Sequence, residues 1–202
     1  MFCGMGGWSI PFIEDGDKVV GIDIADNGYP RAPNARLILR DIRDVDGKDF
    51  AGYDFIVGSP PCEEFSIAKE LQVLRGRERN VQKGLELVRH FLRIVEEAQP
   101  RYWVMENVSM LEWWFPLKPI WRFKISIGGR RTLWGNLPIG LAPEFTFHRD
   151  VYLKYGGKTS AQRAKIPYPI ARFIADCTKQ ATVKVPLWLL VGVATALELQ
   201  AL

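Results

Sequence analysis

The residue of this sequence best suited to chemistry is a cysteine that follows two prolines. Residues Ser59–Cys62 read Ser-Pro-Pro-Cys and follow an apolar run that ends at Gly58. Because proline rings fix φ, they hold the next residue rigidly, and a thiol placed beside a loop in this way is suited to act as a nucleophile. The alternative is a buried structural thiol, which is the commoner fate of a cysteine. Cys3 and Cys177 fit that alternative better.

A carboxyl group that could act together with this thiol follows another apolar run. Glu106 comes directly after Arg101–Met105, so we expect it at the end of a strand next to the strand that precedes Cys62. In that position it could donate a proton during catalysis. A lone glutamate is more often part of a surface ion pair, and the combination with Cys62 is what favours a catalytic role.

A glycine-rich turn and a later acid indicate a site for a nucleotide-like cofactor. Residues Phe2–Gly7 contain three glycines, which permit positive φ and close approach of a ligand, and Asp23 follows Gly7 by 16 residues. A carboxylate at the end of the next strand can accept the hydroxyl protons of a ribose. This arrangement suits NAD, FAD and S-adenosylmethionine (AdoMet) alike, and a plain tight turn is an equally good interpretation.

The elements around these residues predict an α/β fold. Short apolar runs at 18–24, 35–39, 53–58 and 101–105 are typical of strands, and Val81–Ala98 carries its apolar residues on one helical stripe. Strands that alternate with helices indicate a mostly parallel central sheet with helices on both faces. Ligands bind beyond the carboxyl ends of such strands. We therefore expect Asp23, Cys62 and Glu106 along one rim.

The second half of the chain has a weaker pattern and a basic charge. Short strands are predicted around 123–127 and 131–134, with closing helices over Phe173–Gln180 and Val185–Leu202. Between Leu117 and Lys184 there are 13 basic and three acidic residues, a charge of +10, whereas the rest of the chain carries −6. This asymmetry indicates a polyanionic partner such as nucleic acid, and a solvated basic surface is an equal alternative.

Length and composition exclude several classes of protein. The chain has 202 residues, 48% hydrophobic and 25% charged, which is typical of one globular domain and not of a disordered chain. Three cysteines without Cys-x-x-Cys spacing favour a reducing compartment, and two distant histidines do not suggest a zinc site, so no metal is predicted. We expect a cytoplasmic protein, because the longest apolar run is too short for a membrane span and no signal peptide is readable.

Four blocks of the sequence, in this order, resemble the DNA cytosine-C5 methyltransferases. They are Phe2–Gly7, Gly58–Ser66, Met105–Val108 and Arg130–Gly135, and the resemblance returns at Arg163–Ala175. The Pro-Cys block and the Glu-Asn-Val block at this spacing are the specific part. The resemblance implies an AdoMet-dependent, Rossmann-like methyltransferase fold. It also implies a single catalytic domain over 1–202, with 136–162 as a short basic connecting segment in place of a separate target-recognition domain.

The resemblance further implies methyl transfer from AdoMet to C5 of cytosine in duplex DNA, with the cytosine flipped out of the helix. Cys62 would add to C6, Glu106 would contact N3 and the exocyclic amine, and Arg131, in preference to Arg130, would hold the base edge. In the cofactor site, the implied roles are the ribose for Asp23, the adenine for Ile24 and Asp41, and the methionine moiety for Pro60. The full set of implied cofactor residues is Phe2, Gly4, Gly6, Gly7, Asp23, Ile24, Asp41, Ile42 and Pro60.

Three features depart from the family's pattern. Met1 alone precedes Phe2, where the family has several strand residues. Only the 27 residues 136–162 stand where the family has a recognition domain. Residues 163–166 read Arg-Ala-Lys-Ile, where the family has Gly-Asn-Ser/Ala-Val. A separate target-recognition or restriction partner is therefore one possibility. A tRNA methyltransferase of the same chemistry and a non-catalytic AdoMet- or DNA-binding subunit are alternatives. The Pro-Pro-Cys loop disfavours an oxidoreductase.

Overall fold

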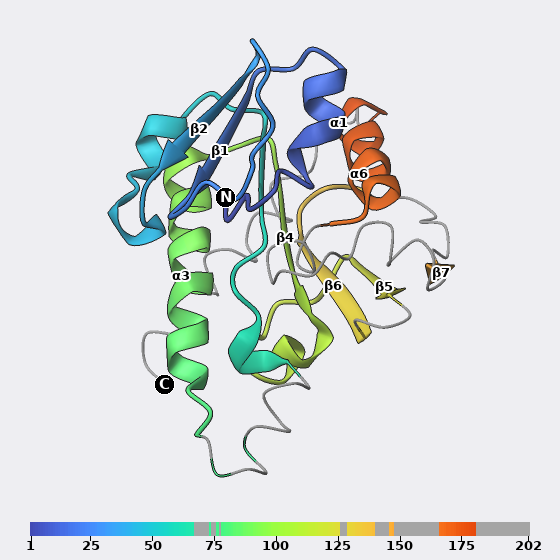
Figure 1. The fold of residues 1–202 in the computed structure, drawn as a ribbon. Coiled ribbons are helices and arrows are strands. Elements are labelled where there is room, and N and C mark those ends of the chain that lie inside the picture. Colours follow the sequence, from blue (N-terminus) through green and yellow to red (C-terminus); the bar gives the residue numbers. More distant parts are fainter. Residues whose placement is uncertain are drawn as a thin grey trace.

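Two β-sheets with helices packed around them form the computed structural model, which describes residues 1–66, 73, 76, 78–125, 129–139, 146–147 and 166–180 (Figure 1). The helices are α1 (Ser9–Glu14), α3 (Val81–Ala98) and α6 (Tyr168–Gln180). Short 3-10 helices occupy the connections: η1 (Ile42–Asp44), η2 (Gly47–Phe50), η3 (Glu63–Phe65) and η4 (Ser109–Trp113). The predicted α/β class is confirmed.

The smaller sheet consists of two parallel strands, β1 (Val19–Asp23) and β2 (Ala35–Leu39). Both lie where the apolar runs predicted them. Their register places Asp23 opposite Leu39, so the carboxyl ends of the two strands finish side by side.

The larger sheet has the strand order β3-β4-β6-β5-β7. Its strands are β3 (Phe55–Gly58), β4 (Tyr102–Val108), β5 (Trp121–Ile125), β6 (Gly129–Gly135) and β7 (Thr146–Phe147). β3 and β4 are parallel, but β6 runs antiparallel to both of its neighbours. The prediction of one, mostly parallel sheet was therefore wrong: the described strands form two sheets, and the larger one is mixed.

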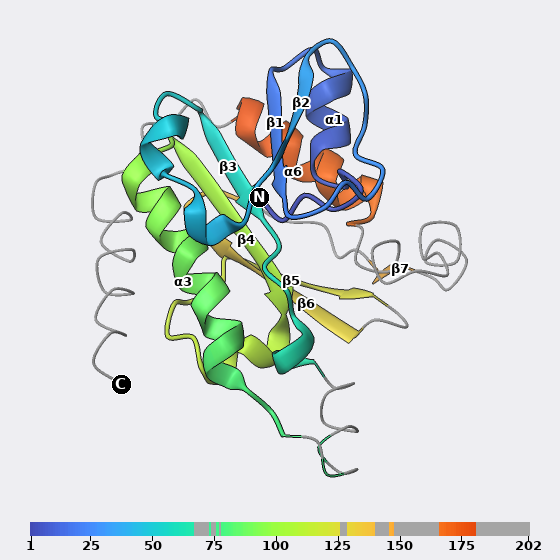
Figure 2. The same ribbon diagram turned by 60° about the vertical axis from the view of Figure 1, so that its left-hand side comes forward.

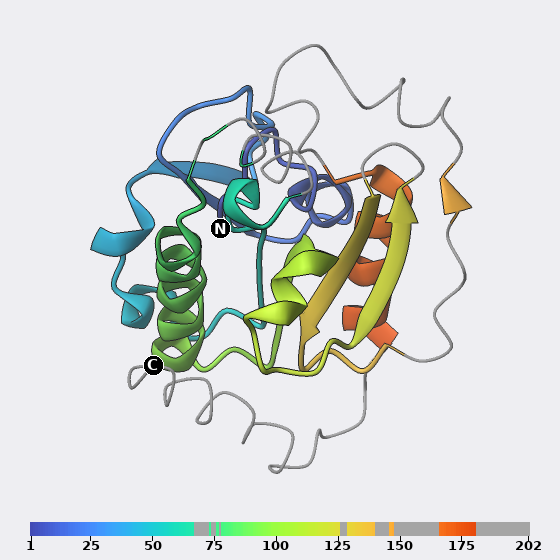
Figure 3. The ribbon, with the colours of Figure 1, turned by 90° about the horizontal axis from the view of Figure 1, so that it is seen from below.

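Helices cover both faces of the larger sheet, as predicted (Figures 2 and 3). Successive residues of a strand point to opposite faces, and β4 shows this directly. Trp103 and Met105 pack in a core cluster with α3, whereas Tyr102 and Val104 pack in a second cluster with α6. β4 is buried along its whole length.

The helix α3 has the bounds that its periodicity predicted. The Asn80 side chain accepts a hydrogen bond from the backbone N–H of Lys83 at 2.9 Å, which caps the first turn. Gln99 takes the left-handed conformation with φ of 50° and ends the helix. The buried stripe includes Leu85, Val88, Leu92 and Val95.

Three predicted boundaries need correction. β4 continues through Glu106 and Asn107 to Val108, because these two polar residues are buried and pair with β6. α6 begins at Tyr168 instead of Phe173, since Pro169 falls in the first turn, where a proline is tolerated. β5 covers 121–125 instead of 123–127.

Several predictions concern residues outside the described ones. The apolar segment Val185–Leu202 and most of the connecting segment 136–162 belong to this group. Among the helices of the described residues, none has the length and apolar character needed to cross a membrane.

Candidate active site

The loop that carries Cys62 is held at both of its ends. At the end of β3, Gly58 lies so close to α3 that a Cβ there would be 2.6 Å from the Phe91 ring, so the strand can approach the helix only with glycine. The carbonyl of Pro60 accepts a hydrogen bond from Asn107 Nδ2 on β4 at 3.0 Å. The carbonyl of Cys62 then accepts one from the Phe65 N–H at 3.0 Å. The nucleophile loop is thus attached to the neighbouring strand and closed by η3.

Cys62, Glu106 and Arg131 come together from three different elements. Arg131 Nη1 lies 3.3 Å from Glu106 Oε1 and 3.8 Å from Cys62 Sγ. The side chains of Arg131 and Glu106 are 14% and 4% exposed, so the ion pair is largely shielded from solvent. One guanidinium therefore contacts both of the groups that the sequence proposes for chemistry. Arg130, the less favoured alternative, is exposed on the same strand.

The position of Glu106 differs from the predicted strand end. It lies inside β4 opposite Leu133, and Arg131 is opposite Val108. The antiparallel pairing of β6 with β4 is what carries the guanidinium back to the carboxylate.

The environment of the Cys62 thiol favours its protonated form in the free protein. Burial raises the pKa of Cys62 above its ordinary value and is the largest cause. The Arg131 cation lowers this pKa, whereas the nearby Glu106 raises it. The guanidinium is therefore the group that favours the thiolate here.

A polar network beside the cluster was not predicted from the sequence. Thr132 Oγ1 donates to Glu112 Oε1 at 2.9 Å and lies 2.8 Å from Ser109 Oγ. Arg122 on β5 binds both oxygens of Glu112, at 2.9 and 2.7 Å. This network holds β5, β6 and η4 together next to Arg131. Its partners are brought together by the antiparallel strands, and no sequence spacing signals them.

The glycine-rich turn is attached to the Asp23 carboxylate by a backbone hydrogen bond. Asp23 Oδ2 accepts a hydrogen bond from the Gly4 N–H at 2.8 Å, and Oδ1 accepts one from Ala25 at 3.3 Å. Gly4 and Gly6 have φ of 47° and 72°. A Cβ on Gly4 would meet nothing within 4 Å, whereas one on Gly6 would overlap Pro30. Gly4 therefore faces open space, and Gly6 is required for packing.

Two exposed apolar side chains lie next to the Asp23 carboxylate. Ile24, which the sequence assigned to the cofactor site, is 74% exposed, and Leu39 is 59% exposed. Leu39 stands opposite Asp23 in the register of β1 and β2, so an apolar surface and a carboxylate share this rim. The sequence analysis missed Leu39, because pairing between strands is needed to place it.

The other predicted cofactor residues are less available in this structure. The Asp41 carboxylate accepts bonds from the backbone N–H and from Nη1 of Arg43, both at 2.9 Å. The Ile42 side chain is buried in a core cluster, so its backbone is the part a ligand could reach. Phe2 packs on two core clusters. Gly7 and Pro60 are buried.

Residues 1–112, just over half of the chain, match the family model of C-5 cytosine-specific DNA methylases. The chain belongs to this family. The matched part of this family member includes the glycine-rich turn, Cys62 and Glu106, whereas Arg131 lies beyond it. The family resemblance seen in the sequence is thereby confirmed.

Relatives of this chain come from bacteria, an archaeon and a phage. The Type II methyltransferase M.FnuDI of Fusobacterium nucleatum is 30% identical over 113 residues, which is 54% of this chain and 31% of the relative. The DNA (cytosine-5-)-methyltransferase M.ApeKI of Aeropyrum pernix is 41% identical over 73 residues, 34% of this chain and 15% of the relative. The orphan methyltransferase M.Rho11sI of Bacillus phage rho11s is 33% identical over 81 residues, with shares of 38% and 14%.

This chain matches about a third or less of the length of these relatives. Among solved structures, it is similar to a protein encoded within an E. coli prophage, with a TM-score of 0.45 and 22% identity over 66% of this chain and 44% of that chain. A likeness of this degree does not decide the fold.

Proposed function

We propose that this chain transfers a methyl group from AdoMet to C5 of cytosine in DNA, with Cys62 as the nucleophile. The observation that carries the proposal is the position of Arg131, whose Nη1 contacts both the Cys62 thiol and the Glu106 carboxylate. Membership of the family supports the same reaction. The proposal takes residues 1–202 as a single catalytic domain with the Rossmann-like methyltransferase fold.

AdoMet fits the rim at the carboxyl ends of β1 and β2. A carboxylate has about four acceptor sites, and Asp23 uses two of them within the protein, which leaves two for ribose hydroxyls. Ile24 and Leu39 offer exposed apolar surface for an adenine ring, and Gly4 leaves room beside the turn. When bound there, the cofactor supplies an electrophilic methyl group. Asp41 fits less directly, because Arg43 already binds its carboxylate.

In the proposed mechanism, the chain's own residues activate the base. The Cys62 thiol passes its proton through water to the Glu106 carboxylate, and Sγ forms a bond to C6 of a cytosine flipped out of the duplex. Glu106 donates a proton or hydrogen bond at N3, so that the electron pair displaced by the addition makes C5 electron-rich. That state of the ring can accept an electrophilic methyl group. Water then removes the C5 proton and the N3 proton returns to Glu106, so that the C5–C6 double bond is restored and the Cys62 thiolate is expelled.

Arg131 has two functions in this mechanism. Because burial raises the pKa of Cys62, the thiolate needs a nearby cation, and the guanidinium lies 3.8 Å from the sulfur. Its bond to Glu106 also holds the carboxyl group on the same side of the base. A cation that contacts both groups couples formation of the thiolate to the position of the proton donor.

The test uses a duplex in which 5-fluorocytosine replaces cytosine. Fluorine cannot leave C5 as a proton does, so the covalent adduct through Cys62 should persist and should form only when AdoMet is present. Intact-protein mass spectrometry followed by peptide mapping identifies the residue. Cys62→Ser should form no adduct and no 5-methylcytosine, while the matched variant Cys177→Ser should behave as the parent chain does.

Two further arms test the substrate and the assignment. Labelled methyl groups from AdoMet should enter duplex DNA and not tRNA. Transfer to tRNA alone would replace the DNA substrate, and an adduct mapped to Cys3 or Cys177 would refute the role of Cys62. Absence of both transfer and adduct would favour a non-catalytic subunit.

A further inference from the structure

An exposed tryptophan lies at the same edge of the larger sheet as the candidate active site. Trp113 is 72% exposed, and it is the only exposed one of the six tryptophans that the structure describes. Tryptophan side chains are highly buried on average, so one that stays in solvent is suited to contact a ligand or partner. The mechanism proposed above gives this residue no role.

The position of Trp113 follows from the strands that carry the site. β3 and β4 are parallel neighbours. Therefore η3, which follows Cys62, and η4, which contains Trp113, both lie beyond the carboxyl ends of these strands. Figures 2 and 3 show η3 and η4 at the same end of the molecule. A duplex that presents a cytosine to Cys62 has to approach this edge of the sheet.

Aromatic contacts connect the Trp113 indole to the nucleophile loop. The centroid of its ring lies 5.8 Å from that of Trp114, and the Trp114 ring lies 5.9 Å from the ring of Phe65 in η3. Phe65 is fully buried and comes three residues after Cys62. The exposed indole is therefore linked by two successive ring contacts to the loop that carries the nucleophile.

The residue that precedes Trp113 is fixed as well. Glu112 accepts hydrogen bonds from Arg122 and from Thr132, which is the neighbour of Arg131 on β6. Trp113 is thus held between the element that follows Cys62 and the strand that carries Arg131. An aromatic side chain that is already held in place loses little conformational entropy when it binds a partner.

Basic side chains accompany this aromatic pair. The Arg79 guanidinium lies 5.4 Å from the centroid of the Trp114 ring, and Lys118 and Arg130 are exposed. The glutamate that precedes Trp113 is already paired with an arginine, so its charge opposes an anion less. Cations and exposed aromatic rings are together typical of nucleic-acid surfaces, because cations bind phosphates and rings stack on bases.

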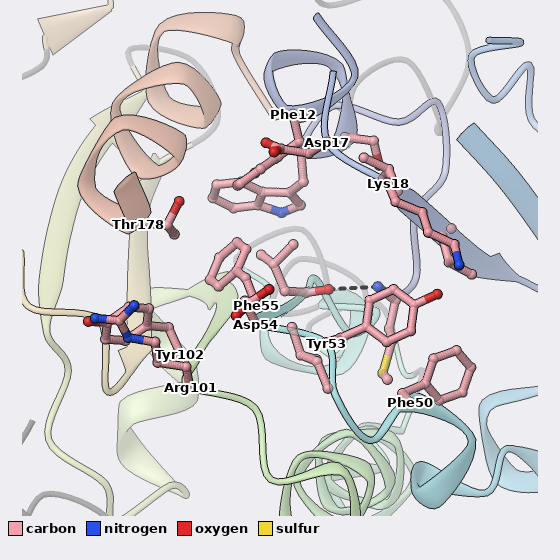
Figure 4. A pocket seen from close by; sticks show the side chains of 18 of the residues that line it. Phe12, Asp17, Lys18, Phe50, Tyr53, Asp54, Phe55, Arg101, Tyr102 and Thr178 are labelled. Atoms are coloured by element: carbon pink, nitrogen blue, oxygen red, sulfur yellow. Dashed lines mark hydrogen bonds between the residues drawn. The ribbon is translucent and has the colours of Figure 1, made fainter. Parts of the chain in front are cut away.

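The cavity between β1 and β3 has no part in this surface. It measures about 660 Å³, and its lining includes Lys18, Asp54 and Arg101, which precede β1, β3 and β4 (Figure 4). It therefore extends toward the amino ends of the strands. Neither Cys62 nor Trp113 lines it, so a duplex that reaches the nucleophile approaches a different part of the molecule.

We propose that Trp113 contacts DNA, and that its exposed indole face stacks on a base next to the flipped cytosine. This inference rests on the proposed function, which brings a duplex to Cys62. Extrusion of one base unstacks its neighbours, and an aromatic ring can cover a base face that is left open. Every base has such a face, so Trp113 would contribute affinity for DNA without preference for a sequence.

The experiment measures binding of the full chain to two short labelled duplexes by fluorescence anisotropy. One contains a central cytosine–adenine mismatch, from which a base is extruded at lower cost, and the other is fully paired. Trp113→Ala should weaken binding to the mismatched duplex by roughly 5- to 100-fold and binding to the paired duplex by less. Trp113→Phe keeps an aromatic face and should retain most of the affinity, whereas the apolar control Trp113→Met should bind as weakly as Trp113→Ala.

The indole itself provides a second measurement. The difference in fluorescence between the parent chain and Trp113→Phe isolates the emission of Trp113. Acrylamide should quench this emission in the free chain, because the indole is exposed, and the mismatched duplex should protect it. All three variants should keep Tm within about 2 °C of the parent value, since the side chain lies on the surface. Losses of affinity are then not losses of folding.

Several results would refute the contact. They are equal affinity of Trp113→Ala and the parent chain for the mismatched duplex, a Trp113 emission that stays fully quenched by acrylamide in the complex, and a parent chain that binds neither duplex. Self-association of the parent chain that disappears in Trp113→Ala, measured by sedimentation, would assign the indole to an interface between copies instead. The quenching comparison decides the question even if the alanine variant does not fold.

These readouts do not involve methyl transfer, so the two proposals fail separately. A chain that methylates cytosine but binds DNA equally well without Trp113 would refute the present inference alone. A chain whose DNA binding depends on Trp113 but which transfers no methyl group would refute the proposed function alone.

Discussion

Replacing Arg131 by methionine tests the central ion pair of the candidate site. Met fills a similar volume but leaves the Glu106 carboxylate, whose side chain is 4% exposed, without the guanidinium that lies 3.3 Å away. Removing one partner of a buried ion pair costs about 3–5 kcal/mol, because the remaining charge stays buried and uncompensated. For a chain of this length, that corresponds to a fall in Tm of roughly 6–20 °C.

Urea unfolding of the purified variants, followed by tryptophan fluorescence, measures this loss as a change in the free energy of unfolding. Arg130→Met is the matched control: it removes the same side chain from the adjacent, exposed position of β6, and it should change the free energy by less than about 0.5 kcal/mol. The double variant Arg131→Met/Glu106→Gln should recover part of the loss, since no buried charge is then left unpaired.

The reasoning would be refuted by an Arg131→Met variant that unfolds within about 1 kcal/mol of the parent chain. The same holds if Arg130→Met costs as much. Either result would mean that solvent screens the pair more than its burial indicates, and Arg131 would then act on Cys62 from a weakly held position.

Three further predictions concern other residues. Gly6→Ala should lower the free energy of unfolding by at least about 1–2 kcal/mol, because φ is 72° and a Cβ would overlap Pro30; Gly4→Ala, which has open space, should cost less in the same urea titration. Burial raises the pKa of Cys3 from 9.0 to about 11. The contribution of this thiol to the free energy of unfolding is therefore fully present below pH 9 and is lost as the pH rises through 11. Cys3→Ala should therefore flatten the decline of the unfolding free energy between pH 8 and 11. Since burial also raises the pKa of Cys62, kcat/KM for methyl transfer should rise from pH 7 to 9, and a flat profile would contradict thiolate attack.

Local patterns were sufficient for elements that form within one stretch of chain. The helix Val81–Ala98 and the strand Ala35–Leu39 have the predicted bounds, because one apolar stripe and one apolar run encode them. β4 was harder, since all of its residues are buried and no alternation marks where it ends. Its polar residues Glu106 and Asn107 resembled a strand end. They are instead satisfied inside the protein, by Arg131 and by the carbonyl of Pro60.

The residues of the candidate site also fall into two groups: those that local patterns predict and those that only pairing between strands brings together. A general rule for parallel strands places Asp23 and Cys62 near strand ends without knowledge of any family, and both lie there. Arg131 entered through the family resemblance alone, because β6 returns antiparallel to β4 and no local spacing reveals that pairing. Leu39 and Glu112 were missed for this reason as well: their positions depend on contacts between strands.

Some of the basic residues in the second half of the chain form ion pairs within the fold. Arg172 and Lys179 both bind Asp15, the residue that follows α1, at 2.5 and 2.6 Å, and Arg122 binds Glu112. Basic residues counted toward a polyanionic partner are thus paired with acids that lie outside the basic segment Leu117–Lys184. Linear counting misses this compensation, since Asp15 and Lys179 are far apart in the sequence but adjacent in the fold. Among the described residues, these ion pairs join α6 to the end of α1, beside which it lies (Figure 1).

The first four residues connect β3 to the candidate cofactor rim. Met1 is bound to β3 through Val57, and Gly4 is bound to the carboxylate of Asp23. Between them, Phe2 has φ of 51°, a left-handed conformation that costs a residue with a side chain about 1–2 kcal/mol. The backbone therefore turns sharply between two fixed points. The contact of Met1 with Val57 fixes the direction from which the chain reaches Phe2, and the contact of Gly4 with Asp23 fixes the turn that holds the carboxylate. The stability of the sheet and the shape of the candidate cofactor site thus depend on the same short segment.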